Sequence, residues 1–239
     1  MEKISLSIFV PCYNEEKNII KALNNIKEAV QNINYEILIA DDCSTDQSVP
    51  IIEKFINDNR GLNIKLFSNK KNQGLGFNYY AMVYKAIGKY YMIINGDAVE
   101  PQNTIKKMIS NIDKADMILT NFGKKDKRKL IRRFISRTFV AIINIITFNN
   151  MKYYNGPAIH LTENVKLYGT GAFGFGYQAE LICALITNQK TYIEIEIENT
   201  DRPEGETKAF TAHNILSVGR SIIMIFLNQI SYLAKIIFK

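Results

Sequence analysis

Short apolar runs and amphipathic segments alternate along the first 120 residues of the chain. Five apolar runs have the length of buried strands, at 4–10, 35–40, 63–67, 90–94 and 115–120. The segments between them carry apolar residues at spacings of three and four, which predicts helices at 16–33, 46–56, 76–87 and 101–112. Because strand and helix alternate strictly, we expect an α/β fold with a mostly parallel sheet and helices on both faces.

The pattern changes after residue 120. A basic segment at 124–137 holds eight Lys or Arg, and an apolar run follows at 139–148. Beyond it the composition predicts a loop at 149–162, a helix at 178–186, a strand at 192–197 and one long amphipathic helix from Ala209 onward. We therefore expect a main domain at 1–208, with halves at 1–120 and 121–208, and a separate C-terminal helix at 209–239.

Composition narrows the function classes. Hydrophobic residues make up 47% of the chain, which argues against disorder, and the net charge of +7 suits nucleic acid, an anionic membrane surface or a phosphorylated ligand. Three isolated cysteines, without a C-x-x-C pair, argue against a zinc site and for a reducing cytoplasm. We expect no membrane-spanning helix, because the nearest candidate, 215–238, is interrupted by polar residues.

Acidic and amide residues follow three of the expected strands, in the loops 11–15, 41–46 and 95–101. Ligands bind at the carboxyl ends of parallel strands. Carboxylates there can accept hydrogen bonds from a nucleoside or hold a divalent cation that bridges two phosphates. The alternative is that these residues cap the following helices, which is the role we expect of Asp46. The chain has no G-x-G-x-x-G after its first strand and no P-loop, which excludes the usual dinucleotide and P-loop sites.

Four motifs, in the same order along the chain, resemble those of glycosyltransferase family two, and within it the branch of dolichol-phosphate mannose synthase and polyprenyl-phosphate glycosyltransferases. They are Val10-Pro-Cys-Tyr-Asn-Glu15, Asp41-Asp-Cys-Ser-Thr-Asp46, Asn95-Gly-Asp97 and Arg202-Pro-Glu-Gly-Glu-Thr-Lys208. The resemblance implies the GT-A fold, which is Rossmann-like, and an inverting transfer from a UDP- or GDP-linked sugar. It also implies a divalent cofactor, Mg²⁺ or Mn²⁺.

The resemblance also assigns roles to residues of the donor site. Asp97 would hold the metal and the nucleotide diphosphate, and Asp42 would contact the base. Pro11, Tyr13 and Glu15 would hold the base and ribose. Arg202 and Lys208 would close over the phosphates.

Three departures from the family pattern stand out. Cys43 replaces a glycine, and Asn95 replaces the first aspartate of D-x-D, so metal dependence rests on Asp97. A neutral amide binds a hard cation more weakly than a carboxylate does. The segment 155–158, Asn-Gly-Pro-Ala, lacks the arginine of the family's S-G-F-R-like segment, which leaves the sugar and acceptor open.

The acceptor side has fewer signals. Arg132 and Ser136 lie four residues apart, hence on one helix face, and resemble the segment that grips a lipid phosphate. The alternative is a basic helix end followed by a core helix. Glu180 is a candidate base for a hydroxyl acceptor, whereas a phosphate acceptor needs no base. Its alternative role is pairing with a basic neighbour. His160 and His213 are interpreted as ordinary polar positions.

We therefore expect a transferase that acts on a polyprenyl phosphate or another lipid-linked acceptor in cell-surface glycan synthesis. Two alternatives remain: transfer to a hydroxyl of a surface polysaccharide, and a non-catalytic nucleotide-sugar-binding subunit of a membrane complex.

We expect a cytoplasmic protein, peripheral on the inner face of the cell membrane through 129–148 and 215–238. For the C-terminal helix three positions are open: in the membrane interface, against the domain, or in the contact between subunits of a homo-oligomer. No nucleic-acid partner is expected, because aromatic residues do not interleave with the basic segment.

Overall fold

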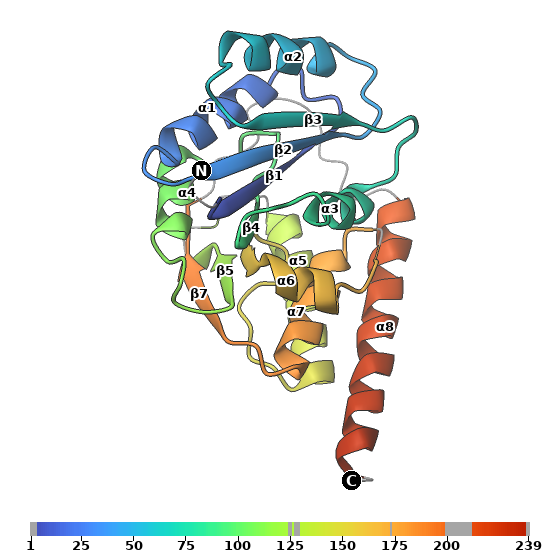
Figure 1. Cartoon of the computed structure of the whole chain (residues 1–239). Helices are drawn as coiled ribbons and strands as arrows, with labels where there is room; N and C mark the ends of the chain where they lie inside the picture. Colours follow the sequence, from blue (N-terminus) through green and yellow to red (C-terminus); the bar gives the residue numbers. More distant parts are fainter. Residues whose placement is uncertain (1–3, 124–125, 127–129, 173, 199–211, 238–239) are drawn as a thin grey trace.

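The computed structural model describes residues 4–123, 126, 130–172, 174–198 and 212–237 (Figure 1). Within these residues one sheet has the strand order β3-β2-β1-β4-β6-β5-β7. The strands are β1 (Leu6–Cys12), β2 (Tyr35–Asp41), β3 (Ile64–Ser68), β4 (Tyr90–Ile93), β5 (Met117–Asn121), β6 (Ile159–Leu161) and β7 (Tyr192–Glu196). All neighbours pair in parallel except β6, which is antiparallel to both β4 and β5. The expected α/β, GT-A-like fold is confirmed.

Helices cover both faces of this sheet. They are α1 (Ile19–Ala29), α2 (Ser48–Asp58), α3 (Leu75–Val83), α4 (Gln102–Ile109), α5 (Leu130–Thr147), α6 (Thr162–Tyr168), α7 (Tyr177–Thr187) and α8 (Ala212–Ile237). Side chains of α1, α2 and α4 form one buried apolar cluster with the sheet, and side chains of α3 and α5–α8 form the other. Successive residues of a strand point to opposite faces, so Ile8 and Val10 enter the first cluster and Phe9 the second.

The loop expected at 149–162 is wrong in its last part. Residues 159–161 form β6, and α6 follows directly from Thr162. A strand of three residues is too short to show alternation, and α6 has only seven residues, so neither produces a periodic pattern. Because β6 separates β4 from β5, the second half of the sheet is mixed and no longer a simple continuation of the first half.

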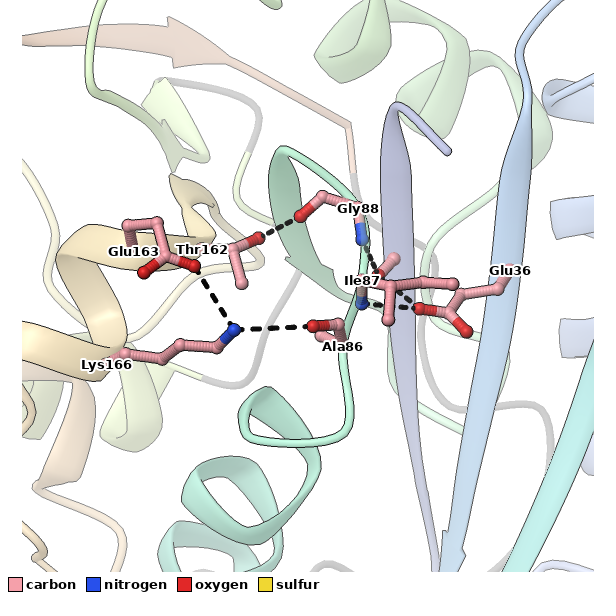
Figure 2. Close-up of polar contacts among 8 residues, drawn as sticks. Glu36, Ala86, Ile87, Gly88, Thr162, Glu163 and Lys166 are labelled. Carbon is pink, nitrogen blue, oxygen red and sulfur yellow. Dashed lines mark hydrogen bonds and ion pairs between the residues drawn. The ribbon is translucent and has the colours of Figure 1, made fainter. Parts of the chain in front are cut away.

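A buried carboxylate organises the amino-terminal edge of the sheet. Glu36 of β2 is fully buried and accepts hydrogen bonds from Ser7 Oγ (2.7 Å), the Ile87 backbone N–H (2.9 Å) and Lys65 Nζ (3.0 Å). These contacts tie the connection between α3 and β4 to β1, β2 and β3. Figure 2 shows Glu36 facing the Ile87–Gly88 backbone.

Gly88 completes this network. Its N–H donates to Ser7 Oγ at 2.9 Å and its carbonyl accepts from Thr162 Oγ1 at 2.6 Å, so α6 is joined to the same edge (Figure 2). A Cβ at this position would lie 2.6 Å from the Ser7 nitrogen, which explains the glycine.

Replacing Glu36 with alanine should lower the free energy of unfolding by about 3–5 kcal/mol, because buried donors lose their acceptor. The matched control is Glu163→Ala, since the Glu163 side chain is 84% exposed and pairs only with Lys166 at its surface (Figure 2). The control should stay within about 0.5 kcal/mol of the parent. Urea unfolding measures both, and equal losses would contradict a structural role for Glu36.

His160 is a second buried polar residue, and its interpretation as an ordinary polar position is wrong. It lies on β6 with 1% exposure, and neither ring nitrogen has a hydrogen-bond partner among the described residues. Burial lowers the pKa of His160 to about 4. The imidazole is therefore neutral in the folded protein, and it takes up a proton near pH 6.5 only when the chain unfolds.

This difference predicts acid sensitivity. The unfolded chain binds a proton that the folded protein does not, so stability falls as pH drops from about 6.5 to about 4, with a loss near pH 5 of about 2 kcal/mol. His160→Leu should remove that part of the pH dependence. Urea unfolding at about pH 7.5 and about pH 5 measures it as the difference between the two proteins. Other groups titrate in both proteins and cancel. Identical pH slopes would overturn the assignment.

The C-terminal helix, α8, contacts the domain as far as Gln229, and the residues beyond it are mostly exposed. Ser221 and Ile225 are buried, whereas Phe226, Ile230 and Ile237 are exposed, and Figure 1 shows the helix running past the other elements. Within the described residues, 216–237 is the one helix with the length and mean hydropathy (1.3) of a membrane-crossing segment. By length and composition alone, this helix could therefore cross a membrane, whereas its polar residues led us to expect an interfacial position. The domain boundary at 208 falls outside the described residues and stays a prediction.

Candidate functional site

Three loops meet at the carboxyl edge of the sheet because β1 lies between β2 and β4. The Gly96 N–H donates to the Pro11 carbonyl (3.2 Å), and the Asp42 N–H donates to the Cys12 carbonyl (2.8 Å). A Cβ on Gly96 would lie 2.7 Å from the Pro11 carbonyl oxygen, so only glycine allows this close approach. The loops 11–15, 41–46 and 95–101, expected to carry the chemistry, are thus adjacent.

The first two loops are locked together by reciprocal hydrogen bonds. The Asn14 N–H donates to Ser44 Oγ (2.9 Å), and Asn14 Oδ1 accepts from the Thr45 N–H (2.8 Å). The Glu15 N–H donates to Ser48 Oγ at 2.8 Å. These hydrogen bonds fix the backbone beside Tyr13 and Glu15. The contacts of Tyr13 and Glu15 with the base and ribose remain predictions.

Asp46 binds the first N–H of α2, although the N-cap residue itself is Gln47. Its Oδ1 accepts from the Ser48 N–H (2.9 Å) at the start of α2, and its Oδ2 accepts from the Glu16 N–H (3.1 Å). Burial opposes ionisation of this carboxyl, but the hydrogen bonds from Ser48 and the backbone hold the pKa of Asp46 below its ordinary value. Asp46 therefore joins α2 to the loop that precedes α1.

Each of the three loops contains a non-glycine residue with left-handed backbone: Asn14 (φ 55°), Cys43 (φ 68°) and Ala98 (φ 58°). Such a conformation costs L-residues about 1–2 kcal/mol and persists only where the surrounding contacts enforce it. At position 43 it explains why the family pattern has glycine there.

Asp42 holds the loop before α3. Its carboxylate, 6% exposed, accepts from the Gln73 N–H (2.8 Å), the Gly74 N–H (2.9 Å) and Asn69 Nδ2 (2.9 Å). Sequence reasoning assigned Asp42 to the base and missed this role, because the partners lie about 30 residues further along the chain. A contact with the base remains a prediction.

Asp97 lies half-buried in the turn after β4, beside Asn95 and Glu100. Glu100 is 4% exposed and accepts two hydrogen bonds from Asn95, one from its backbone N–H to Oε2 (3.2 Å) and one from Nδ2 to Oε1 (2.9 Å). Burial, together with the nearby charge of Asp97, raises the pKa of Glu100 to about 8. The sequence analysis did not select Glu100, since an acid just before a helix also suits a helix amino terminus.

On the acceptor side, Glu180 of α7 is buried and contacts a different set of elements. Its carboxylate is hydrogen-bonded to Ser221 of α8 and to Thr170. Burial raises the pKa of Glu180, and the Arg220 charge opposes that shift. Glu180 also lines a cavity of about 160 Å³ between the end of α5, α7 and α8.

The segment 155–158 is held between β4, β5 and α7. Gln178 Nε2 donates to the Gly156 carbonyl, Thr120 Oγ1 donates to the Pro157 carbonyl (2.7 Å), and the Ile93 N–H donates to the Ala158 carbonyl (3.2 Å). A Cβ on Gly156 would lie 2.4 Å from Thr120 Oγ1, so Thr120 leaves no room for a side chain at this position.

The remaining acceptor candidates lie on α5, which confirms that Arg132 and Ser136 share a helix. Arg132 is exposed and Ser136 is partly exposed. The neighbouring Arg133 lies 3.9 Å from an Asp126 carboxylate oxygen. Arg202 and Lys208, expected to close over the phosphates, lie outside the described residues.

Residues 7–175 match the model of Glycosyl transferase family 2, which is more than half of the chain. The chain belongs to this family. TarS of Staphylococcus aureus strain MW2, a poly(ribitol-phosphate) β-N-acetylglucosaminyltransferase, is 32% identical over 219 residues, which cover 90% of this chain and 34% of TarS. The chain thus spans about a third of that relative. A dolichol-phosphate mannosyltransferase of Pyrococcus furiosus is 26% identical over 144 residues, or 58% of this chain and 40% of that protein.

Two solved structures have a similar fold. The crystal structure of TarS residues 1–349 in complex with UDP-GlcNAc has a TM-score of 0.65 at 20% identity, covering 97% of this chain and 71% of that one. The mannosyltransferase PcManGT from Pyrobaculum calidifontis, in complex with GDP-Man and Mn²⁺, has a TM-score of 0.63 at 14% identity, covering 98% of this chain and 75% of that one.

The donor loops suit a divalent cation that is bound jointly with a diphosphate. Among the described residues, no three His, Cys, Asp or Glu side chains gather as a metal site. The family position offers the Asp97 carboxylate and the Asn95 amide oxygen, which are hard oxygen ligands. Mg²⁺ and similar ions are commonly held by one or two protein carboxylates, with waters and substrate phosphates completing the coordination. The donor set therefore fits Mg²⁺ or Mn²⁺ as a partner of the nucleotide.

The strained backbone at Cys43 can be tested directly. Cys43→Gly should raise the free energy of unfolding by about 0.5–1 kcal/mol, because relief of the left-handed strain exceeds the entropic cost of glycine. Guanidinium unfolding measures this gain. Cys43→Ala is the control, since it removes the thiol but keeps the Cβ and should give no gain. If alanine stabilises as much as glycine, backbone strain is not the cause.

Proposed function

We propose that this chain is an inverting glycosyltransferase that takes a sugar from a UDP- or GDP-linked donor. The observation that carries the proposal is the convergence of the loops 11–15, 41–46 and 95–101 at one edge of the sheet, held by the Gly96–Pro11 and Asp42–Cys12 hydrogen bonds. Family membership supports it, and so do the similar structures that contain UDP-GlcNAc or GDP-Man.

The chemistry is a single displacement. The acceptor oxygen attacks the anomeric carbon, the bond from that carbon to the diphosphate oxygen breaks, and the nucleoside diphosphate leaves with the electron pair. A divalent cation, when bound, neutralises charge on the departing diphosphate. Asp97 would hold that cation, Arg202 and Lys208 would close over the phosphates, and the loops 11–15 and 41–46 would hold the nucleoside.

For the acceptor we propose a polyprenyl phosphate or another lipid-linked molecule. Arg132 lies among exposed apolar side chains on α5, including Leu130, Ile131 and Phe134. An arginine beside apolar surface suits a phosphate group at the boundary of a membrane. A phosphate oxygen is already ionised near neutral pH, so this reaction needs no base.

This acceptor implies a cytoplasmic protein on the inner face of the membrane. α5 packs against α8, and both helices expose apolar side chains. Exposed polar residues within α8, such as Asn228, Ser231 and Lys235, favour an interfacial position over a crossing one.

A hydroxyl acceptor is the second candidate, and Glu180 favours it. A buried carboxyl with a raised pKa is suited to accept a proton near neutral pH. TarS, the relative with the longer match, is named for transfer to poly(ribitol-phosphate), a polymer.

Transfer assays separate these functions. Purified protein is given radiolabelled UDP- and GDP-sugars with either undecaprenyl phosphate or hydroxyl-bearing oligosaccharides. Asp97→Ala should lower turnover about 100-fold or more, because charge on the leaving group loses its counter-ion. Glu163→Ala, an exposed acid outside the site, is the control. Full activity of Asp97→Ala would contradict the donor site.

Glu180→Gln distinguishes the acceptors in the same assay. With a phosphate acceptor its rate should stay close to the parent's, and with a hydroxyl acceptor it should fall about 10²- to 10⁴-fold. Label found only in soluble oligosaccharide would defeat the lipid proposal. Binding of the donor without turnover on any acceptor would support a non-catalytic subunit instead.

A further inference from the structure

Glu100 is the buried acid closest in sequence to the proposed cation site, and the family motifs do not include it. Both of its carboxylate oxygens accept from one residue, Asn95, through the backbone N–H (3.2 Å) and Nδ2 (2.9 Å). The Glu100 carbonyl accepts from Asn25 Nδ2 at 3.1 Å, which ties the Glu100 backbone to α1. With 4% exposure, Glu100 has almost no contact with solvent.

We infer that Glu100 is a positioning residue for Asn95: it binds the amide nitrogen of Asn95 and so presents the amide oxygen to the cation and diphosphate. This inference rests on the proposed donor site. An amide side chain has one donor end and one acceptor end, and a rotation of its terminal torsion exchanges them. In the structure both Glu100 oxygens accept, an arrangement that needs the ionised carboxylate, which a cation at Asp97 favours; in that form Glu100 faces the donor end of the amide.

The pairing also accounts for the missing aspartate of D-x-D. An aspartate at position 95 would place one of its oxygens where Asn95 Nδ2 now lies, 2.9 Å from Glu100 Oε1. Two ionised carboxylate oxygens at that distance repel each other, and they can stay this close only by sharing a proton, which removes one of the two negative charges. Asparagine is the residue of similar shape that both satisfies Glu100 and keeps an oxygen available as a ligand.

Hydrogen-bond complementarity predicts the effect of Glu100→Gln. The new amide can accept from the Asn95 backbone N–H with its oxygen, but its nitrogen then faces the Asn95 side chain. Asn95 satisfies that nitrogen only by turning its own oxygen inward, which leaves its NH₂ group toward the cation. Loss of such a supporting partner typically weakens metal binding about 10- to 100-fold.

The same logic predicts a rescue. In the double variant Asn95→Asp with Glu100→Gln, the new amide nitrogen donates to one oxygen of the new carboxylate, and the other oxygen remains available as a ligand. Asn95→Asp alone should bind Mn²⁺ no better than the parent and should unfold more easily. The double variant should recover both stability and Mn²⁺ affinity, so the two substitutions are strongly non-additive.

The experiment measures Mn²⁺ binding by electron paramagnetic resonance of the free ion, in the presence of UDP or, separately, GDP, on the full chain. Thermal unfolding of each variant is recorded in parallel. Gln102→Ala is the control for a change at the start of α4, because among the described residues the Gln102 side chain donates only to the Glu28 carbonyl, at the surface. It should leave Mn²⁺ affinity unchanged.

The inference is supported if Glu100→Gln stays folded but binds Mn²⁺ about 10-fold more weakly or worse, and the double variant returns to within about threefold of the parent. It is overturned if the parent binds Mn²⁺ with nucleotide and Glu100→Gln binds it equally well, or if the double variant is no better than the sum of the single changes. Failure of the parent to bind Mn²⁺ with either nucleotide would overturn the proposed donor site together with this inference.

Discussion

The site depends on the position of β1 between β2 and β4. The last carbonyl groups of β1, those of Pro11 and Cys12, accept from N–H groups just beyond the two neighbouring strands, at Gly96 and Asp42. These backbone bonds bring three loops, separated by about 30 and about 50 residues of sequence, within contact of one another. Any ligand at this edge is therefore held by segments whose relative positions are set by the sheet itself.

Buried carboxylates stabilise the connections at both edges of this sheet. At the amino-terminal edge, Glu36 accepts from the connection between α3 and β4, and at the carboxyl edge Asp42 accepts from the loop before α3. α3 thus begins at one carboxylate and is followed by a segment bound to the other. Because a buried carboxylate is stable only when donors surround it, each carboxylate favours the one backbone conformation that places those donors around it.

The sequence predicted the first half of the fold well because parallel strands buried on both faces appear as continuous apolar runs. It failed at β6, where three residues carry too little pattern, and at His160, which looks polar in the sequence but is enclosed by neighbouring strands. The three loops that we propose hold the donor were correctly expected to meet at the carboxyl edge of the sheet, by their place after the strands. The partners of Asp42 and the Asn95–Glu100 pair were missed, because hydrogen-bond geometry between loops leaves no periodic signal in the sequence.

The same contrast explains why the acceptor side is less determined than the donor side. The donor edge is defined by backbone hydrogen bonds between strands, whereas Glu180 and α8 are joined through side chains and a partly exposed helix. The base-free transfer to a phosphate and the base-assisted transfer to a hydroxyl place different demands on Glu180. Burial has already raised its pKa toward the range a base requires, and the Arg220 charge opposes that shift. Hydrogen bonds with Ser221 and Thr170 oppose the effect of burial as well, so the proton affinity of Glu180 depends on how α7 packs against α8.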